Sequence, residues 1–435
     1  MSTRLLEWLP ASLAEFLAAS PELAYVALLF LLIVLPRILV RWKIPTAITS
    51  LALGALSSMS FGVFLADPTV QLLATLGISA LFLFAGLEVD LDELVSRRRV
   101  LGQHVLLRLV ALPLIAYLIV GAADLSWRVS LLIVLAIITP SAGFILDSLA
   151  SWPLSADQRT WVRSTTIATE LVSLLALFFV MQSASLGQFV AGTTALVVLV
   201  LVLPLMFRAF ARWIAPYAPN SDFAFLLMLA LVAAFTTRKL GAYYLVGAFV
   251  VGMVAQRFRE NLPTMSSEHT LHAVEVFASF FIPFYFFNAG LHLRPEHFSP
   301  AAFGVGLACL LMVGVRIGVV AVHRRVALGE PLADGARVGI SLAPTLVFTL
   351  VIAELLRDGF GAPAPVFGGL VIYALVNTIV PTLLLKAPPP LFDQPLAATV
   401  TLAPEPPHDP AARMPAPVTM GSDPFVTGPD FDTRA

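Results

Sequence analysis

Charged residues are scarce in this chain. Asp, Glu, Lys and Arg make up 12% of its 435 residues, against the ~25% that is typical of soluble domains. The net charge of −1 gives no sign of the basic surface that nucleic-acid-binding proteins carry. By contrast, 59% of the residues are hydrophobic and the mean hydropathy is +0.91. This composition excludes an ordinary soluble protein and indicates a polytopic membrane protein that binds no nucleic acid.

Cysteines and catalytic motifs are also scarce or missing. The single cysteine, Cys309, lies in an apolar run, so the sequence excludes a disulfide framework and a multi-cysteine zinc site. The chain has no HExxH sequence, P-loop, nucleophile elbow or Gly-rich dinucleotide fingerprint. We therefore expect no enzyme activity and no cofactor.

Apolar segments of membrane-spanning length recur along most of the chain. A helix needs about 20 apolar residues to cross the hydrocarbon core, and lipid offers the backbone no hydrogen-bond partners. We therefore predict an all-α polytopic membrane protein with thirteen transmembrane helices. The predicted spans are 23–40, 44–65, 70–88, 100–121, 128–148, 161–182, 188–208, 221–238, 240–256, 271–290, 301–322, 336–356 and 363–386.

Composition divides the chain into three parts. Residues 1–22 lack a clean basic start, so we expect a short periplasmic segment and not a cleaved signal peptide. Residues 23–386 hold all the predicted spans. Residues 387–435 contain twelve prolines and no apolar period, so we expect a disordered cytoplasmic tail.

Arg and Lys are distributed unevenly over the predicted loops. Loops after odd-numbered spans hold fifteen: Arg37, Arg41, Lys43, Arg97, Arg98, Arg99, Arg159, Arg163, Arg208, Arg212, Arg257, Arg259, Arg324, Arg325 and Arg337. The alternate loops hold five: Arg128, Arg238, Lys239, Arg294 and Arg357. Since cytoplasmic loops are enriched in positive residues, this bias predicts an external N-terminus and a cytoplasmic C-terminus.

Few ionisable residues lie at bilayer depth. Such a residue costs roughly 2.5–3.5 kcal/mol on insertion scales, so it marks a functional site by default. Glu170 lies near the middle of span 161–182, where it can bind a cation when ionised and a proton when neutral. Thr169 and Thr139 can add oxygen ligands. The alternative is a structural carboxylate that pairs with a buried arginine.

Two arginines also lie within predicted spans. Arg316 lies deep in span 301–322 and stays charged at any relevant pH, so we expect a supporting charge and not a proton carrier. We interpret Arg108, in the upper half of span 100–121, as an arginine that snorkels towards the membrane interface.

Proline interrupts two predicted spans in similar ways. Span 128–148 contains Thr139-Pro140-Ser141, and span 336–356 contains Pro344-Thr345. Polar residues recur about thirty residues before and after each proline: Arg108 and Glu170 around the first, Arg316 and Asn377 around the second. The two spans run in opposite directions, as in an inverted repeat. Transporters place ion sites at such broken helices, although prolines also kink membrane helices without a function.

Several segments match motifs of a known transporter family. The most specific is Leu76–Asp90, LGISALFLFAGLEVD, which is similar to the family's LG…LLFxxGLExD signature. Weaker matches are Ile44-Pro45 with Leu53-Gly54, Thr139-Pro140-Ser141, Leu240–Gly252 and Phe280–Leu291. On these motifs, residues 25–386 resemble the monovalent cation:proton antiporters, especially the Kef- and NapA-like branch.

This resemblance implies a fold, a site and a mechanism. The fold has thirteen helices with inverted repeats, in which a dimerisation scaffold holds a mobile core with two proline-broken, crossed helices. Transport occurs by elevator-like alternating access. The family's ion-binding aspartate maps onto Glu170, its accompanying acid or amide onto Thr169, and its core lysine or arginine onto Arg316. With Thr at 169, the chain keeps one titrating carboxylate beside a permanently charged arginine, which favours electroneutral exchange.

We therefore predict a homodimeric antiporter of a bacterial inner membrane that exchanges Na+ or K+ for protons at Glu170. Two alternatives stay open: a small-organic-anion symporter or uniporter on a related scaffold, and a non-transporting membrane sensor or assembly subunit.

Two charged clusters also have two interpretations. Glu88 and Asp90 form either a cation vestibule or a solvated helix end. Glu268, His272 and Glu275 belong either to a pH sensor or to a solvated helix start.

Overall fold

The computed structural model describes residues 21–386 apart from 62–63, 90–91, 93–94, 96–97, 184, 219–220, 240–243 and 259–267. The predicted tail 387–435 and residues 1–20 of the N-terminal segment lie outside the described residues. All described residues belong to one compact unit.

The described elements are all helical, which confirms the predicted fold class. The α-helices are α2 (Pro21–Leu39), α3 (Thr46–Leu56), α4 (Pro68–Leu87), α6 (Arg98–Ala123), α7 (Trp127–Ile138), α8 (Ala142–Leu149), α9 (Ala156–Gln182), α10 (Leu186–Trp213), α11 (Asp222–Lys239), α12 (Tyr244–Arg257), α13 (Glu268–Leu291), α14 (Pro300–Leu328), α15 (Leu332–Ser341), α16 (Leu346–Phe360) and α17 (Ala364–Leu384). Short helices are η1 (Val40–Trp42), η2 (Ser57–Phe61) and η3 (Pro295–Phe298).

Each predicted span coincides with a helix or a pair of helices. Within the described residues, nine helices are long and apolar enough to cross a membrane, and Trp127–Leu146, which joins α7 to α8, counts as one of them. The α15–α16 pair adds a tenth span that bends by 52° at its break. Two shorter apolar helices are Thr46–Ser60 and Leu245–Arg257. The multi-pass character is therefore clear, while the count of thirteen stays a prediction.

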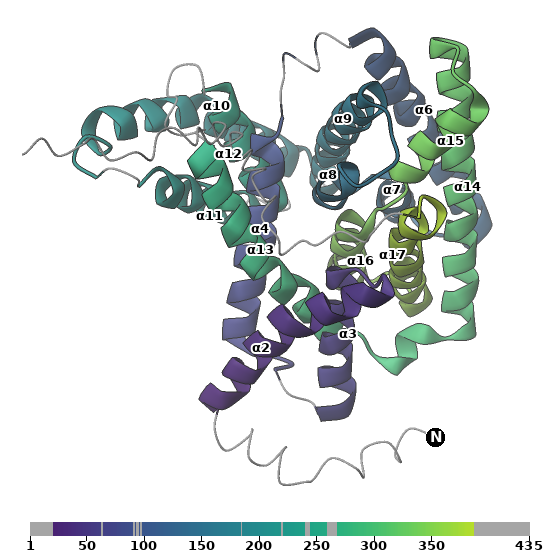
Figure 1. The fold of residues 1–435 in the computed structure, drawn as a ribbon, viewed down its shortest axis with the longest axis horizontal. Coiled ribbons are helices and arrows are strands. Elements are labelled where there is room, and N and C mark those ends of the chain that lie inside the picture. The colour runs from purple at the N-terminus through teal and green to yellow at the C-terminus, as the bar shows by residue number, and fades with distance from the viewer. Residues whose placement is uncertain are drawn as a thin grey trace, which may run out of the picture. The chain divides into compact units, whose positions relative to one another are not determined.

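The helices form two packed groups (Figure 1). In the first group, α4 packs against α12 and α13, α3 packs against α2 and α13, and α10 and α11 pack against α12. In the second group, α9 packs against α6, α7 and α8, α6 and α16 pack against α7, α17 packs against α14 and α16, and α15 packs against α14. We call these the α4–α13 group and the α7–α16 group. Contacts of α9 with α10 and α12, and of α4 with α8, connect the two.

Glycines allow the closest helix crossings in the α4–α13 group. A Cβ atom at Gly86 of α4 would lie 2.2 Å from the Phe249 carbonyl oxygen of α12, and Gly252 faces Gly86 from that helix. Gly54 of α3 and Gly290 of α13 make the same kind of crossing. Small residues let membrane helices approach closely and gain packing energy that lipid does not supply.

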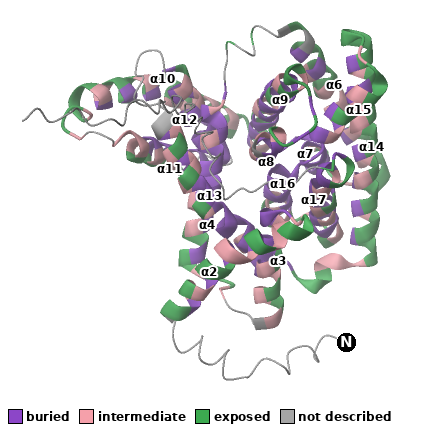
Figure 2. Cartoon of the chain, in the orientation of Figure 1, coloured by how far each residue is buried: buried purple, intermediate pink, exposed green. Residues whose placement is uncertain are grey.

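Burial separates the helices that face lipid from those that surround the site. In the apolar windows, 6% of α6 and 11% of α10 are buried, but 83% of the window that spans the α7 break is buried. Figure 2 shows the same contrast, with exposed residues on α10 and α14 and buried residues on α7, α16 and α17. The broken helices therefore lie inside the protein, where irregular backbone is tolerated at membrane depth.

Candidate functional site

The two proline breaks meet each other. Thr139, Pro140 and Ser141 separate α7 from α8, and residues 342–345 separate α15 from α16. The Ser141 N–H donates to the Pro344 carbonyl oxygen at 2.9 Å, and the Val347 N–H donates to the Ser141 hydroxyl oxygen at 3.0 Å. Proline interrupts helical hydrogen bonding because it has no N–H. The structure thus brings together the two breaks that lie about two hundred residues apart in the sequence.

Arg316 and Asn377 bind the backbone at the end of α15. Arg316 donates from Nη2 to the Leu342 carbonyl oxygen at 2.7 Å and from Nη1 to that of Ala343 at 3.1 Å. Asn377 donates from Nδ2 to the Ala343 oxygen at 2.6 Å and to the Thr345 hydroxyl at 3.1 Å. These carbonyls form the negative end of the half-helix, where a cation is favourable.

Arg108 binds a backbone carbonyl at the end of α7, as Arg316 does at the end of α15. Its Nη1 donates to the Ile138 carbonyl oxygen at 2.5 Å, so the interpretation of Arg108 as a snorkelling residue was wrong. The guanidinium turns inward because the carbonyl at the break has lost its helical partner, which makes it a strong acceptor at low dielectric. Arg108 and Arg316 therefore occupy matching places in two sets of spans, as the repeat predicts.

Tyr373, which sequence reasoning missed, joins the two halves. Its hydroxyl donates to the Ile137 carbonyl oxygen of α7 at 2.7 Å and accepts from Arg316 Nη1 at 3.0 Å. The available signal was spacing, since Tyr373 lies one helical turn before Asn377 on α17.

Glu170 of α9 lies at the start of α8. Its side chain is 4% exposed, and the backbone N–H of Ala142, the first residue of α8, hydrogen bonds to the carboxylate. The other oxygen, Oε2, is buried without a hydrogen-bond partner among the described residues. No described arginine pairs with Glu170, so the structural ion pair that the alternative interpretation requires is not formed within that part of the chain.

Of the two predicted threonine ligands, Thr139 lies in the break directly after α7, and Thr169 lies on α9 directly before Glu170. The Thr139 hydroxyl donates to the Leu135 carbonyl oxygen at 2.6 Å and lies 2.9 Å from the Ser173 hydroxyl, which sequence reasoning missed. Thr169 donates to the Thr165 carbonyl oxygen at 2.7 Å and lines a small pocket beside Arg108 and Ser173. Each hydroxyl oxygen keeps lone pairs for a further partner.

Carboxylates lie towards one end of α4 and α9. Glu88 follows the last residue of α4, and its Oε1 lies 3.9 Å from an Arg163 guanidinium nitrogen that is half exposed. Glu88 is also close enough to Glu170 and to Glu275 to interact electrostatically with both. On α13, His272 pairs with Glu275 at 3.5 Å. Of the other residues in the predicted clusters, Asp90 lies outside the described residues and the side chain of Glu268 is not described.

A cavity of about 510 Å³ opens at the opposite end of α4 and α9. It is lined by residues that include Gln71, Met181, His292, Glu354 and Asp358. Acidic residues therefore lie at one end of α4 and α9, and a polar cavity lies at the other end. The buried Glu170 lies on α9, between these two ends.

Comparisons with known proteins agree on one family. The family model described as "Sodium/hydrogen exchanger, transmembrane" matches residues 26–388. The Na(+)/H(+) antiporter NhaS5 of Synechocystis sp. is 24% identical over 391 residues, which cover 85% of this chain and 53% of that protein. The chain thus matches about half the length of this relative.

A solved structure shares the fold. The sodium proton antiporter MjNhaP1 from Methanocaldococcus jannaschii superposes with a TM-score of 0.60 at 14% identity, covering 84% of this chain and 95% of that chain. This likeness and the family match over residues 26–388 confirm the resemblance seen in the sequence motifs. The chain belongs to the sodium/hydrogen exchanger family.

Proposed function

We propose that this protein exchanges a monovalent cation, Na+ or K+, for protons, with Glu170 as the site that both ions share. The observation that carries the proposal is a buried carboxylate, one oxygen of which has no partner among the described residues, next to two broken helices that hydrogen bond to each other. Family membership and the antiport activity named for the relatives support it.

Competition at one carboxylate couples the two ions. When ionised, Glu170 attracts a cation, and we propose that the Thr139 and Ser173 hydroxyls, which lie 2.9 Å apart, and the Thr169 hydroxyl add hard oxygen ligands. When protonated, Glu170 is neutral and no longer binds the cation. A carboxylate that is buried with neither ion is costly. The core therefore crosses between its two orientations only when the site is neutralised by one ion or the other.

Fixed charges set the stoichiometry. Arg108 and Arg316 hydrogen bond to backbone carbonyls at the two breaks, and in this proposal both keep their charge throughout the cycle. Glu170 is then the group that changes charge at the site, so one cation replaces one proton and the exchange is electroneutral.

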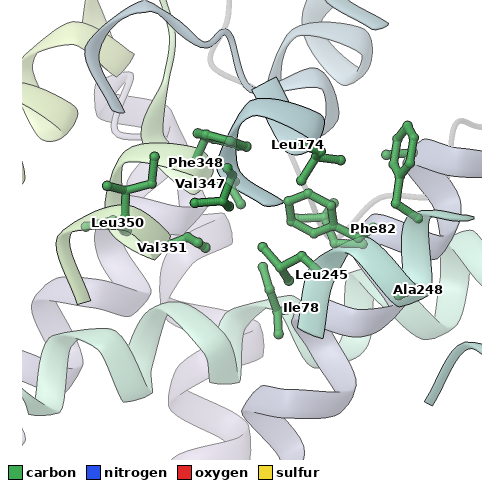
Figure 3. Close-up of a cluster of buried hydrophobic side chains, with 14 of the residues drawn as sticks. Ile78, Phe82, Leu174, Leu245, Ala248, Val347, Phe348, Leu350 and Val351 are labelled. Carbon is green, nitrogen blue, oxygen red and sulfur yellow. The ribbon is translucent and has the colours of Figure 1, made fainter. Parts of the chain in front are cut away.

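Alternating access requires the α7–α16 group to move against the α4–α13 group. Figure 3 shows the side chains between them: Ile78 and Phe82 of α4 and Leu245 of α12 face Leu174 of α9 and Val347 and Phe348 of α16. All are apolar, so sliding breaks no hydrogen bonds or ion pairs among them.

We further propose that the protein is a homodimer in a bacterial inner membrane with its C-terminus in the cytoplasm.

Flux in proteoliposomes tests this function. Purified protein is reconstituted with the membrane potential clamped, and Na+, K+ and Li+ gradients are applied in turn while internal pH is followed. Wild-type protein should move protons against at least one of these cations, and Glu170→Gln should abolish that movement while inserting normally. Flux that survives in Glu170→Gln would remove this residue from the mechanism. Carboxylate uptake without a cation response would instead favour an organic-anion carrier.

A second arm tests electroneutrality. If one cation exchanges for one proton, the initial rate should not depend on the value at which the potential is clamped.

The matched control for Glu170→Gln is Glu354→Gln, which removes a carboxylate that lines the cavity and not the site. It should keep its exchange activity.

A further inference from the structure

We propose that His104 is a positioning residue for the ion site: as a neutral hydrogen-bond acceptor, it holds Arg108 against the broken end of α7. The consequence for transport rests on the function proposed above, while the contact itself does not. His104 lies one helical turn before Arg108 on α6 and is 1% exposed. Neither residue appears in the set that the sequence predicted for the site.

The geometry assigns the acceptor. Arg108 Nε donates to His104 Nε2 at 3.0 Å, while its Nη1 donates to the Ile138 carbonyl oxygen. Arginine carries only donors, so His104 Nε2 must offer its lone pair. This assigns the neutral tautomer with its proton on Nδ1, a buried nitrogen that has no hydrogen-bond partner among the described residues. Because one planar guanidinium makes both bonds, its orientation at Ile138 is fixed from His104.

The surroundings of His104 match an acceptor that stays neutral. From α9, Trp161 meets its ring edge-on with centroids 5.4 Å apart, and from α14 the ring of His323 lies 5.6 Å away. Its charged neighbours are Arg108 on its own helix and Arg316 and Arg324 on α14. Arg324 stacks on Trp161 and is paired with Glu330. A positively charged ring would therefore face three guanidinium groups.

Arg108 connects this contact to the ion site. The Ile138 carbonyl that it binds directly precedes Thr139, whose hydroxyl lies beside Ser173. Arg108, Thr169 and Ser173 line the same small pocket between α6, α7 and α9. If Arg108 loses its second anchor, the α7 end and the Thr139 oxygen lose their fixed positions beside Ser173, which lies about one helical turn from Glu170 on α9.

The two breaks are thus held by similar but distinct units. At α15, Arg316 is steadied by the Tyr373 hydroxyl at 3.0 Å. At α7, Arg108 is steadied by the imidazole of His104 at 3.0 Å. In each unit, an arginine binds the carbonyl end of a half-helix, and a neutral hydrogen-bond acceptor orients that arginine.

Three variants test the proposal in two measurements. His104→Gln keeps a neutral oxygen acceptor in place of Nε2, and His104→Leu keeps bulk but accepts nothing. His323→Leu is the matched control, because it alters the same buried cluster at a residue that does not hydrogen bond to Arg108 in the described structure. The measurements are the cation-dependent proton flux, resolved into maximal rate and KM, and hydrogen–deuterium exchange of the backbone amides in residues 138–142.

We expect His104→Leu to lower the maximal rate roughly tenfold to a hundredfold, the effect of losing a hydrogen bond to a charged group. Amide exchange at the α7 break should also speed up. His104→Gln should restore both properties, and His323→Leu should resemble wild type. Equal effects of Gln and Leu at position 104, or no effect of either, would overturn the proposal. If wild-type protein shows no flux, the exchanger function fails, and amide exchange alone still decides the role of His104.

Discussion

At the scale of single residues, the site combines two arginines with one buried carboxylate. Arg108 and Arg316 each bind the carbonyl end of a half-helix. Glu170 has one buried oxygen without a partner among the described residues. In the proposed mechanism the arginines therefore shape the site, while Glu170 exchanges ions.

Arg316→Gln should impair the protein strongly. It removes the charge from the Leu342 and Ala343 carbonyls, and a hydrogen bond to a charged group contributes about 1.5–3 kcal/mol. We expect exchange activity to fall at least roughly tenfold, by the same arithmetic. Flux and thermal stability in the same preparation measure it.

The matched control for that change is Arg337→Gln. Arg337 of α15 forms an exposed ion pair with Asp334, and such pairs contribute about 0–1 kcal/mol. If Arg337→Gln were as harmful as Arg316→Gln, the contacts at the break would not explain the loss.

The pH dependence of cation binding follows from competition at Glu170. As pH falls, more of this carboxyl is protonated, so the apparent KM for the cation should rise in proportion to the proton concentration while the maximal rate holds. Initial rates over a series of pH values and cation concentrations measure this. A KM that does not change with pH would mean that the proton and the cation bind at separate places.

At the scale of elements, α4 depends on the residue that caps it. Asp67 accepts hydrogen bonds from the Thr69 and Val70 amides at 2.8 and 2.9 Å, and the Tyr25 hydroxyl of α2 donates to its other oxygen. Burial alone raises the pKa of Asp67, but the hydrogen bonds from Tyr25, Val70 and Thr69 together outweigh it. The pKa of the folded state therefore lies below its ordinary value of 3.8.

Asp67→Ala should destabilise the protein by about 1 kcal/mol, the usual effect of losing an N-cap. The sign of the pH effect follows from the lowered pKa. The contribution is present above pH 3.8 and is lost as pH falls through the lower folded-state pKa. Thermal unfolding of both proteins should show a difference near neutral pH that shrinks in strong acid. A difference that grows on acidification would reverse this assignment.

A second prediction at the scale of elements concerns the close crossing of α4 and α12. Gly86→Ala places a methyl group 2.2 Å from a backbone oxygen, so the helices must separate. We expect a loss of about 1–3 kcal/mol, as for other overpacked sites. A methyl group at Gly304 on α14 meets no described atom within 4 Å, so Gly304→Ala should leave the melting temperature unchanged or raise it slightly, because alanine is the better helix former. Equal melting temperatures for the two variants would show that the crossing tolerates extra volume.

At the scale of the whole molecule, hydropathy was enough to predict the helical class and the segments that form it. The predicted breaks at Pro140 and Pro344 do interrupt their helices, because proline removes a backbone donor wherever it stands. Spacing did not reveal that the breaks bind each other, since those contacts join residues far apart in the chain. Nor did it reveal the direction of Arg108, which depends on a carbonyl of another helix.

The central claim is that proton and cation compete for Glu170, and proton release measures this most directly. Cation is added to purified protein in a weakly buffered solution containing a pH indicator, starting below the pH at which Glu170 is fully ionised. Wild-type protein should release up to one proton for each cation bound, and Glu170→Gln should release none. Cation binding without proton release, or equal release from Glu170→Gln, would contradict the account.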